Sequence, residues 1–247
     1  MAKKVYQLNY GGHPVRYSFL YPQTYALLRP LPRLTAEAEP DVVVTQEMID
    51  RVRRLFPADT TDSFLEYRCL IGLTAQKLLQ YGCCIFHAVS FVFRGRAWLL
   101  TAPPGTGKTT QFLNWQRLHP GEITMISGDL PVLEGRGDGS VWVYPTSWNG
   151  KEDIGSRISA PLGGIIVLEQ GSEDRIAPLP TCESVRPLFR QFMVQLETEE
   201  EILALARLLE QALTAAPCWK MINRGGDEST ELLRRTVIQY LEKEEST

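Results

Sequence analysis

The chain has 247 residues, of which 44% are hydrophobic and 22% charged, a composition that is typical of a globular protein and excludes collagen-like and disordered chains. Lysine and arginine number 26 and aspartate and glutamate 29, so the formal charge is -3. This balance argues against a general nucleic-acid partner, because phosphate backbones bind cationic surfaces. No apolar run approaches the roughly 20 residues that cross a bilayer, so no membrane partner is expected either.

The five cysteines are an odd number, and none of them forms a C-x-x-C pair. No His-rich segment accompanies them, so local spacing indicates neither a disulfide framework nor a zinc site. The first residues lack the continuous apolar stretch of a signal peptide. We therefore expect a cytoplasmic protein whose cysteines are reduced and mostly buried.

The N-terminal third predicts a small α+β region. Apolar and polar residues alternate on both sides of Gly11-Gly12, which predicts a β-hairpin over residues 6–19. Helices are expected over about 45–55 and from Asp62 past Leu79, the second one ending at Gly82. We interpret residues 1–82 as an N-terminal accessory region that precedes a core at 83–247.

In the core, strand patterns alternate with helix patterns, which is typical of an α/β fold. The expected strands are residues 85–93, 97–101, 124–126, 141–143, 165–168 and a short one at 218–219, and the expected helices are 183–195, 199–213 and 228–242. The first two strands are separated by Arg94-Gly95, which predicts a hairpin. Thr198 and Glu201 have the spacing of a capping box at the start of the second helix.

Residues 102–109 read Ala-Pro-Pro-Gly-Thr-Gly-Lys-Thr, which matches the Walker A pattern except that alanine replaces the first glycine. Such a loop binds phosphate through backbone N–H groups at a helix N-terminus, and glycines permit the dihedral angles that it needs. An apolar strand precedes it and a helix-compatible segment follows, as the motif requires. The expected nucleotide contacts are Pro104, Gly105, Thr106, Gly107, Lys108, Thr109 and Thr110.

Within this loop, Lys108 is expected to reach the β- and γ-phosphates of ATP, and the Thr109 hydroxyl to be a ligand of Mg²⁺. Asp129 follows an apolar strand and is expected at the same edge of the sheet. It is interpreted as a Mg²⁺ ligand, as the acceptor of a proton from an attacking hydroxyl, or as a turn residue after Gly128. Glu169 also follows a buried strand, but Leu168 stands where a Walker B aspartate is usual, so we interpret Glu169 as a strand-end residue.

The order of these motifs resembles the HPr kinase/phosphorylase superfamily. It is more closely similar to the short HPr-kinase-related proteins of bacteria, some of which occur with peptide-modification systems. The resemblance covers roughly residues 83–240. It is carried by His87-Ala88, the phosphate-binding loop and residues 126–129, 145–151 and 165–169, in that order.

The resemblance implies a P-loop core with a mixed β-sheet of the HPr kinase and phosphoenolpyruvate carboxykinase type. It implies transfer of a γ-phosphoryl group to a hydroxyl, with Lys108 and Thr109 at the phosphates and metal and Asp129 as the acid after the second core strand. His87 would match the histidine on the strand before the loop, near the active site. The chain departs from the family in having one acid where the family has two, in Ala102, and in lacking a counterpart of the phosphorylase motif.

Three residues have two interpretations each. Periodicity makes His87 a hydrogen-bonded core residue beside Ile85 and Val89, whereas the resemblance places it in the active site, where an imidazole can carry protons. Trp148 and Lys151 lie in a non-periodic segment, where they would contact a substrate or simply belong to a packed surface loop.

We conclude from the sequence that the chain is an ATP- and Mg²⁺-dependent kinase, in which Lys108, Asp129 and His87 carry the reaction. Its acceptor would be the hydroxyl of a peptide, a protein side chain or a small molecule. Two alternatives stay open: a nucleotide-binding regulatory or scaffold protein without phosphotransfer, and an ATPase that uses Glu169 to polarise water. ATP rather than GTP is the expectation from the family, and the oligomeric state is open.

Overall fold

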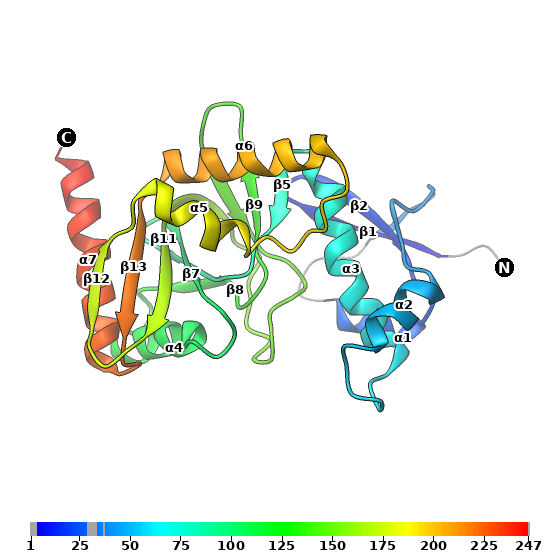
Figure 1. Ribbon diagram of the computed structural model, residues 1–247, viewed down its shortest axis with the longest axis horizontal. Coiled ribbons are helices and arrows are strands. Elements are labelled where there is room, and N and C mark those ends of the chain that lie inside the picture. The colour runs from blue at the N-terminus through cyan, green and yellow to red at the C-terminus, as the bar shows by residue number, and fades with distance from the viewer. Residues whose placement is uncertain (1–3, 29–33, 37, 247) are drawn as a thin grey trace.

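The computed structural model describes residues 4–28, 34–36 and 38–246. The elements of the described chain are β1 (Val5–Tyr10), β2 (His13–Ser18), α1 (Pro22–Leu27), β3 (Leu34–Ala36), β4 (Val42–Val43), α2 (Gln46–Arg53), α3 (Asp62–Leu79), β5 (Cys83–Ile85), β6 (Val89–Phe93), β7 (Arg96–Thr101), α4 (Lys108–Leu118), β8 (Thr124–Ser127), β9 (Val132–Gly135), β10 (Val141–Tyr144), β11 (Ala160–Gln170), β12 (Arg175–Pro178), α5 (Thr181–Phe189), α6 (Glu199–Ala215), β13 (Cys218–Asn223) and α7 (Asp227–Glu245). Figure 1 shows their arrangement, with β1, β2 and α1–α3 at one end of the molecule and α4, α7 and β11–β13 at the other.

The N-terminal part contains the expected hairpin and both expected helices. Strands β1 and β2 are antiparallel, and Gly11 and Gly12 turn the chain between them with φ angles of 61° and 90°. They lie in a sheet of the order β3-β1-β2-β4. The side chains of Thr45 and Thr61 accept hydrogen bonds at the N-termini of α2 and α3, which explains where these helices begin.

Nine of the described strands form the main sheet, in the order β5-β9-β10-β11-β7-β6-β8, with β13 beside β11 and β12 beside β13. The sheet is mixed: β11 is parallel to β7 and β13, whereas β6 is antiparallel to β7 and to β8. Strands β7, β8, β11 and β13 therefore run in one direction and end at the same edge. The fold is a mixed α/β fold with a curled mixed sheet, as expected at that level of detail.

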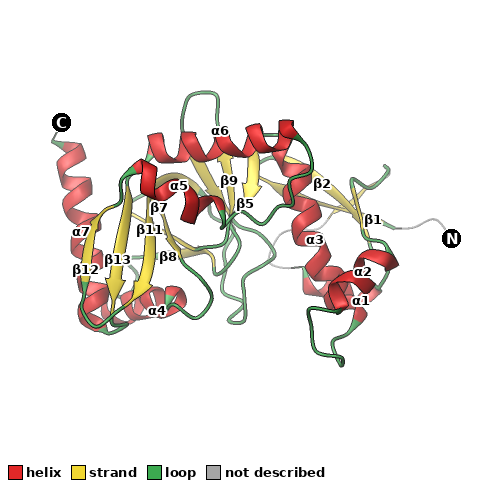
Figure 2. Cartoon of the chain, in the orientation of Figure 1, coloured by secondary structure: helices red, strands yellow, loops and turns green. Residues whose placement is uncertain are grey.

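Helices cover both faces of this sheet because neighbouring residues of each strand point to opposite sides. In β7, Leu99 belongs to a core cluster with Leu205 and Leu208 of α6, whereas Leu100 belongs to a second cluster with Phe112 of α4 and Leu233 of α7. Figure 2 shows α6 above the strands and α4 below them. The capping box of Thr198 and Glu201 begins α6 as predicted.

One expected strand is wrong in a way that matters for the site. Residues 85–93 alternate like one strand, but the structure divides them into β5 and β6 and leaves His87 between the two. At the break, the N–H of His87 donates to the Gln191 carbonyl and that of Ala88 to the Asp129 carbonyl. The same pairing ends the expected helix 183–195 early, at Phe189, because the residues after it bond to the segment around His87.

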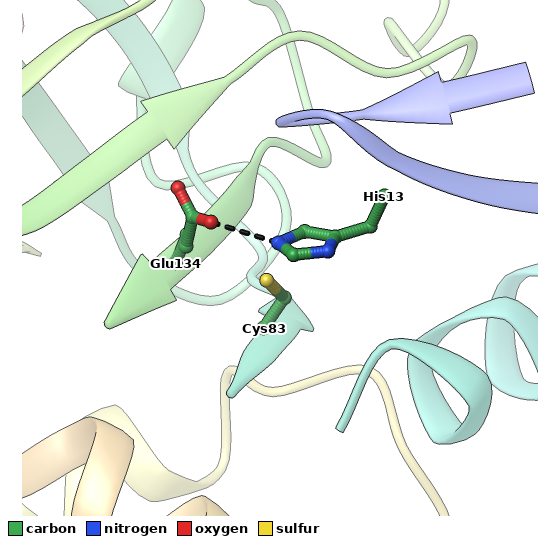
Figure 3. A group of neighbouring side chains, drawn as sticks. All are labelled: His13, Cys83 and Glu134. Carbon is green, nitrogen blue, oxygen red and sulfur yellow. Dashed lines mark hydrogen bonds and ion pairs between the residues drawn. The ribbon is translucent and has the colours of Figure 1, made fainter. Parts of the chain in front are cut away.

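The N-terminal part and the main sheet meet at β5 and β9. Gly11 lies so close to the ring of Tyr144 that an added Cβ would lie 2.8 Å from Tyr144 Cε2. His13, two residues after Gly11, forms a hydrogen bond with Glu134, next to Cys83 (Figure 3). One hydrophobic cluster contains residues from both sides of position 82, Leu8 and Ile85 among them. The division of the chain at residue 82 stays a prediction.

No helix in the described ranges combines the length and the apolar character needed to cross a membrane.

Candidate active site

The Walker-type segment forms a loop between β7 and α4, in the predicted strand–loop–helix order. Gly105 and Gly107 have φ angles of 81° and 98°, in the left-handed region where a side chain is disfavoured. Gly107 is the N-cap of α4, and Lys108 is its first residue. The loop thus brings a helix N-terminus, with its unpaired N–H groups, to the edge where β7 ends.

Lys108 is only 8% exposed, and its ammonium group is bound inside the loop. The Nζ atom donates to the carbonyl oxygen of Ala102 at 2.8 Å and to that of Pro103 at 3.4 Å. Burial lowers the pKa of Lys108, and the negative charge of Asp129 opposes that shift. The lysine and the aspartate are therefore close enough for their charges to interact.

The other loop residues are more accessible. Pro104, Gly105 and Thr110 are exposed, and Thr106, Gly107 and Thr109 are half-buried. The Thr106 hydroxyl donates to the Pro103 carbonyl at 2.7 Å, and Gln170 Nε2, from the end of β11, donates to the Gly105 carbonyl at 3.1 Å. The loop is held closed by these bonds while its outer surface stays open to a ligand.

A buried amide network lies behind the loop, and sequence reasoning missed it. Asn223, at the end of β13, donates to the Glu169 carbonyl at 3.0 Å and accepts from Gln111 Nε2 at 3.3 Å. Gln111 Oε1 in turn accepts from the Thr230 hydroxyl at 2.8 Å. The network ties β11, β13, α4 and α7 together directly behind Gly107. The end of a parallel strand at this edge was the signal that could have identified Asn223.

Asp129 lies just after β8, at the same edge, and contacts His87. Asp129 Oδ1 is 3.3 Å from His87 Nε2, and the side chain of Asp129 is 31% exposed. His87 Nδ1 is 3.1 Å from Gln191 Oε1, and its carbonyl accepts from the hydroxyl of Thr101, the last residue of β7. His87 is thus fixed between the strand that leads into the loop and the acid, with one ring nitrogen facing Gln191 and the other facing Asp129. Gln191 was not predicted.

A second segment, residues 145–156, packs on Asp129. An added Cβ at Gly128 would lie 2.6 Å from the carbonyl oxygen of Asn149, and one at Gly150 would lie 3.3 Å from Asp129 Cβ. The Leu130 N–H donates to the Trp148 carbonyl at 3.1 Å. Two glycines therefore permit the close approach that places this segment beside the carboxylate.

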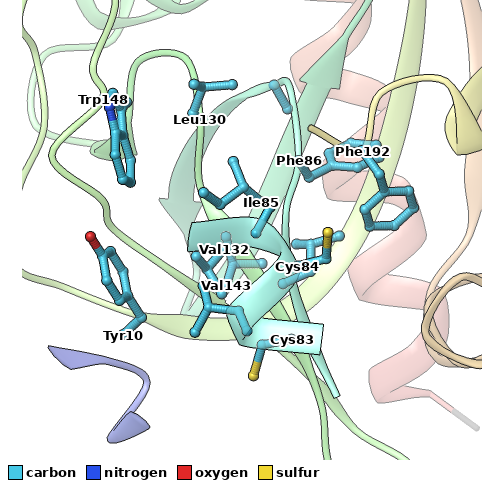
Figure 4. Packing of buried hydrophobic residues seen from close by; sticks show 14 of the residues in the cluster. Tyr10, Cys83, Cys84, Ile85, Phe86, Leu130, Val132, Val143, Trp148 and Phe192 are labelled. Carbon is cyan, nitrogen blue, oxygen red and sulfur yellow. The ribbon is translucent and has the colours of Figure 1, made fainter. Parts of the chain in front are cut away.

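The two predicted substrate contacts in this segment have different environments. Trp148 is 1% exposed, and its indole faces the ring of Tyr10, with centroids 6.3 Å apart (Figure 4). The ring of Tyr67 lies 6.2 Å from it. An aromatic ring buried in this way has almost no surface for a substrate, so we assign Trp148 a packing role. Lys151 is exposed, and its contact with a substrate stays a prediction.

Tyr67, on α3, is a further polar group near the acid. Its hydroxyl donates to the Ser147 carbonyl at 3.5 Å. Burial raises the pKa of Tyr67 to about 12; Arg68 opposes this, and the negative charges of Asp153 and Asp129 add to it. The N-terminal part of the chain thus contributes a group to the surroundings of Asp129.

Thr109 and Asp129 supply a hydroxyl and a carboxylate, the oxygen ligands that Mg²⁺ prefers. Glu169 has a different partner, since its Oε2 atom is 2.6 Å from Lys220 Nζ and both side chains are about half exposed. This ion pair agrees with the interpretation of Glu169 as a strand-end residue.

No protein-family model matches the chain, and no curated protein matches it. Among solved structures, it is similar to an Hpr(Ser) kinase/phosphatase from Coxiella burnetii, with 10% sequence identity and a TM-score of 0.35 over 66% of this chain and 99% of that one. At this identity and TM-score, the likeness assigns neither a detailed fold nor a function to the chain.

Proposed function

We propose that the chain is an ATP- and Mg²⁺-dependent kinase that transfers the γ-phosphoryl group of ATP to a hydroxyl of a peptide, a protein side chain or a small molecule. The observation that carries this proposal is the convergence of Lys108 and Asp129 at one sheet edge, with His87 Nε2 3.3 Å from the acid. A phosphate-binding loop beside a carboxylate has the two functions that phosphoryl transfer needs, which are charge neutralisation and orientation of a hydroxyl.

In the proposed reaction, the loop N–H groups and Lys108 hold the triphosphate. The acceptor oxygen attacks the γ-phosphorus, the bond to the β,γ-bridging oxygen breaks, and ADP leaves with that electron pair. Asp129 orients the acceptor hydroxyl and takes its proton, and His87 holds Asp129 in place. Bound Mg²⁺, with Thr109 and Asp129 as its ligands, would neutralise the negative charge that develops on the phosphates.

The order of motifs supports a more detailed proposal for the fold. We extend it to a P-loop core of the HPr kinase type in residues 83–247, with residues 1–82 as an accessory region that shapes the acceptor site. Tyr67 supports that role, because it brings α3 near Asp129. Because ATP is the proposed phosphoryl donor, the reaction would take place in the cytoplasm.

The test is transfer of label from γ-labelled ATP to a panel of serine- and threonine-containing peptides, proteins and small hydroxyl compounds. We expect labelled product with the wild type and its loss in Lys108→Ala and in Asp129→Asn. Glu169→Gln is the matched control, because Glu169 is an acid at the same edge that is paired with Lys220.

Release of free phosphate without any acceptor, abolished by Glu169→Gln, would instead show the ATPase. Tight ATP binding that survives Asp129→Asn, without transfer to any member of the panel, would favour the regulatory protein. ATP binding that is unchanged in Lys108→Ala would contradict the proposed role of the loop.

A further inference from the structure

A second cluster of reactive side chains lies away from the phosphate-binding loop, where the N-terminal hairpin meets the edge of the main sheet. His13, Cys83 and Glu134 each place one ligand atom so that all three atoms lie within 4.8 Å of one another. Within the described ranges, this is the one group of three or more His, Cys, Asp or Glu side chains that meets this condition. Figure 3 shows the imidazole pointing at the carboxylate, with the sulfur beside both.

Backbone pairing fixes two of the three positions. Cys83 and Glu134 are directly opposite each other in the antiparallel pair of β5 and β9, so their side chains lie on the same face of the sheet. Cys83 is fully buried and Glu134 is 8% exposed. The positions of Cys83 and Glu134 relative to each other are therefore set by the pairing of two buried strands.

The hairpin brings the third ligand to this pair. The close approach of Gly11 to Tyr144 sets the position of the hairpin turn, and the ring of His13 stacks on Tyr81 with centroids 4.7 Å apart. His13 Nε2 lies 2.8 Å from Glu134 Oε1. The imidazole is thus held on one side by an aromatic ring while its Nε2 atom faces the carboxylate.

The remaining oxygen of the carboxylate has its own partners. Glu134 Oε2 accepts from the Tyr144 hydroxyl at 2.7 Å and from Arg136 Nε at 3.0 Å. These two bonds orient the carboxylate and leave Oε1 directed at His13. In metal sites, such outer hydrogen bonds commonly fix a ligating carboxylate.

We propose that His13 Nε2, Cys83 Sγ and Glu134 Oε1 form a Zn²⁺ site that fastens the β1–β2 hairpin to the edge of the main sheet. Nitrogen, sulfur and carboxylate oxygen together are the donor set that Zn²⁺ prefers over Mg²⁺ or Ca²⁺. Zinc bonds of about 2.0–2.3 Å place tetrahedral ligand atoms on the order of 3.4 Å apart. His13 Nε2 and Glu134 Oε1 are 2.8 Å apart, and all three ligand atoms lie within 4.8 Å of one another, so adjustments of the side chains would bring them to that spacing.

Binding would exchange a proton for a metal ion. The thiol of Cys83 loses its proton to solvent and becomes a thiolate ligand. The proton that His13 Nε2 shares with Glu134 Oε1 moves to Nδ1, so that the Nε2 lone pair is free to bind the ion, and water takes the fourth position. The two positive charges of the ion then balance the thiolate and the carboxylate, and Arg136 adds a further positive charge at Glu134 Oε2, so both buried anionic groups have cationic partners. Because only three ligands come from the protein, the fourth position would stay open to water or another small ligand.

The experiment uses the full chain, without nucleotide, and Co²⁺ as a spectroscopic substitute for Zn²⁺. We expect one equivalent of Co²⁺ to give the visible bands of a tetrahedral ion and a thiolate-to-cobalt charge-transfer band, and one equivalent of Zn²⁺ to abolish both. Cys83→Ser removes the charge-transfer band and lowers Zn²⁺ affinity at least tenfold in a chelator competition. The matched control Cys182→Ser, at an exposed cysteine, changes neither.

Since Cys83→Ser alters a buried position, His13→Gln provides the second test. The His13 side chain is 27% exposed, so this variant is expected to keep the fold and to lower Zn²⁺ affinity at least tenfold. Zn²⁺ is expected to raise the Tm of the wild type and of Cys182→Ser, but not that of His13→Gln. A charge-transfer band that survives Cys83→Ser, an affinity unchanged in His13→Gln, or no stoichiometric metal binding would each show that the cluster is a hydrogen-bond network only.

Discussion

His87 Nε2 lies 3.3 Å from Asp129 Oδ1, and this contact joins the break between β5 and β6 to the end of β8. The backbones of the same two segments are also bonded, because the Ala88 N–H donates to the Asp129 carbonyl at 2.8 Å. The histidine therefore has a fixed relation to the acid that does not depend on a flexible loop, as a precise catalytic geometry requires.

We predict that His87→Gln lowers kcat about a hundredfold, because the variant loses the group that orients Asp129 and carries protons. The affinity for ATP should change less than twofold, since His87 does not belong to the phosphate-binding loop. Steady-state kinetics and nucleotide titration separate the two effects. Gln191→Ala removes only the support at Nδ1 and should cost about tenfold in kcat; an equal loss of ATP affinity in both variants would contradict the assignment.

Gly128→Ala should destabilise the protein by about 2 kcal/mol or more. Its Cβ would lie 2.6 Å from the Asn149 carbonyl oxygen and 2.9 Å from that of Ile154, and both are backbone atoms, which adjust less easily than the end of a flexible side chain. Urea unfolding measures the change. Gly137→Ala, where nothing lies within 4 Å of the added atom, is the control and should be nearly neutral.

Asn223→Ala should reduce the free energy of unfolding by about 1–3 kcal/mol, since it leaves Gln111 and the Glu169 carbonyl without their buried partner. The variant should also weaken ATP binding, because the network lies behind Gly107. Unfolding curves and nucleotide titration test the two parts. The control is Asn114→Ala. Asn114 is half-buried on α4, the helix that carries Gln111, and the variant loses the hydrogen bond from Asn114 to the Gly225 carbonyl. It is expected to have the smaller effect on both the free energy of unfolding and ATP binding.

Glu122 predicts a pH dependence of stability. Hydrogen bonds from Arg234 and, to a lesser extent, Trp115 lower the pKa of Glu122 from 4.5 to about 2, against the opposing effect of burial. A carboxyl group whose pKa is lower in the folded state stabilises the protein above the unfolded pKa, and the contribution is lost as the pH falls through the folded value.

The wild type should therefore exceed Glu122→Gln by about 1–2 kcal/mol at pH 7, and this difference should shrink between pH 4.5 and 3. Urea unfolding at a series of pH values measures it. Glu210→Gln, at an exposed position of α6, serves as the reference, and a difference that stays constant down to pH 3 would contradict the assignment.

Local signals in the sequence were enough to predict much of the fold. Gly11-Gly12 marks the first hairpin, the Thr198 capping box marks the start of α6, and the glycine-rich loop marks the junction of β7 and α4. In each of these cases the residues that decide the structure lie within a few positions of one another, so the interactions that determine it can be predicted from a short stretch of sequence.

The rest depends on residues that are distant in the sequence. Gln191 is 104 positions from His87, Asn223 is 112 from Gln111, and Glu134 is 121 from His13. The break at His87 was missed for the same reason, because the alternation of residues 85–93 is that of a continuous strand and the bonds that interrupt it come from residues 129 and 191. The proposed zinc ligands His13, Cys83 and Glu134 are also too far apart in the sequence to form a recognisable metal-binding spacing.

Strand β11 has a consequence for the synthesis of this protein. Its first residues pair with β10, its middle with β7, and residues 165–170 with β13, which ends at Asn223. When the ribosome has added Gln170, the last of these partners is still 53 residues from complete. At translation rates of roughly 5–20 residues per second, the apolar half of β11 presents an open hydrogen-bonding edge for roughly 3 to 10 s. During that interval the edge is open to pairing with other chains, and β13, which lies between β11 and β12, is the last described strand to emerge.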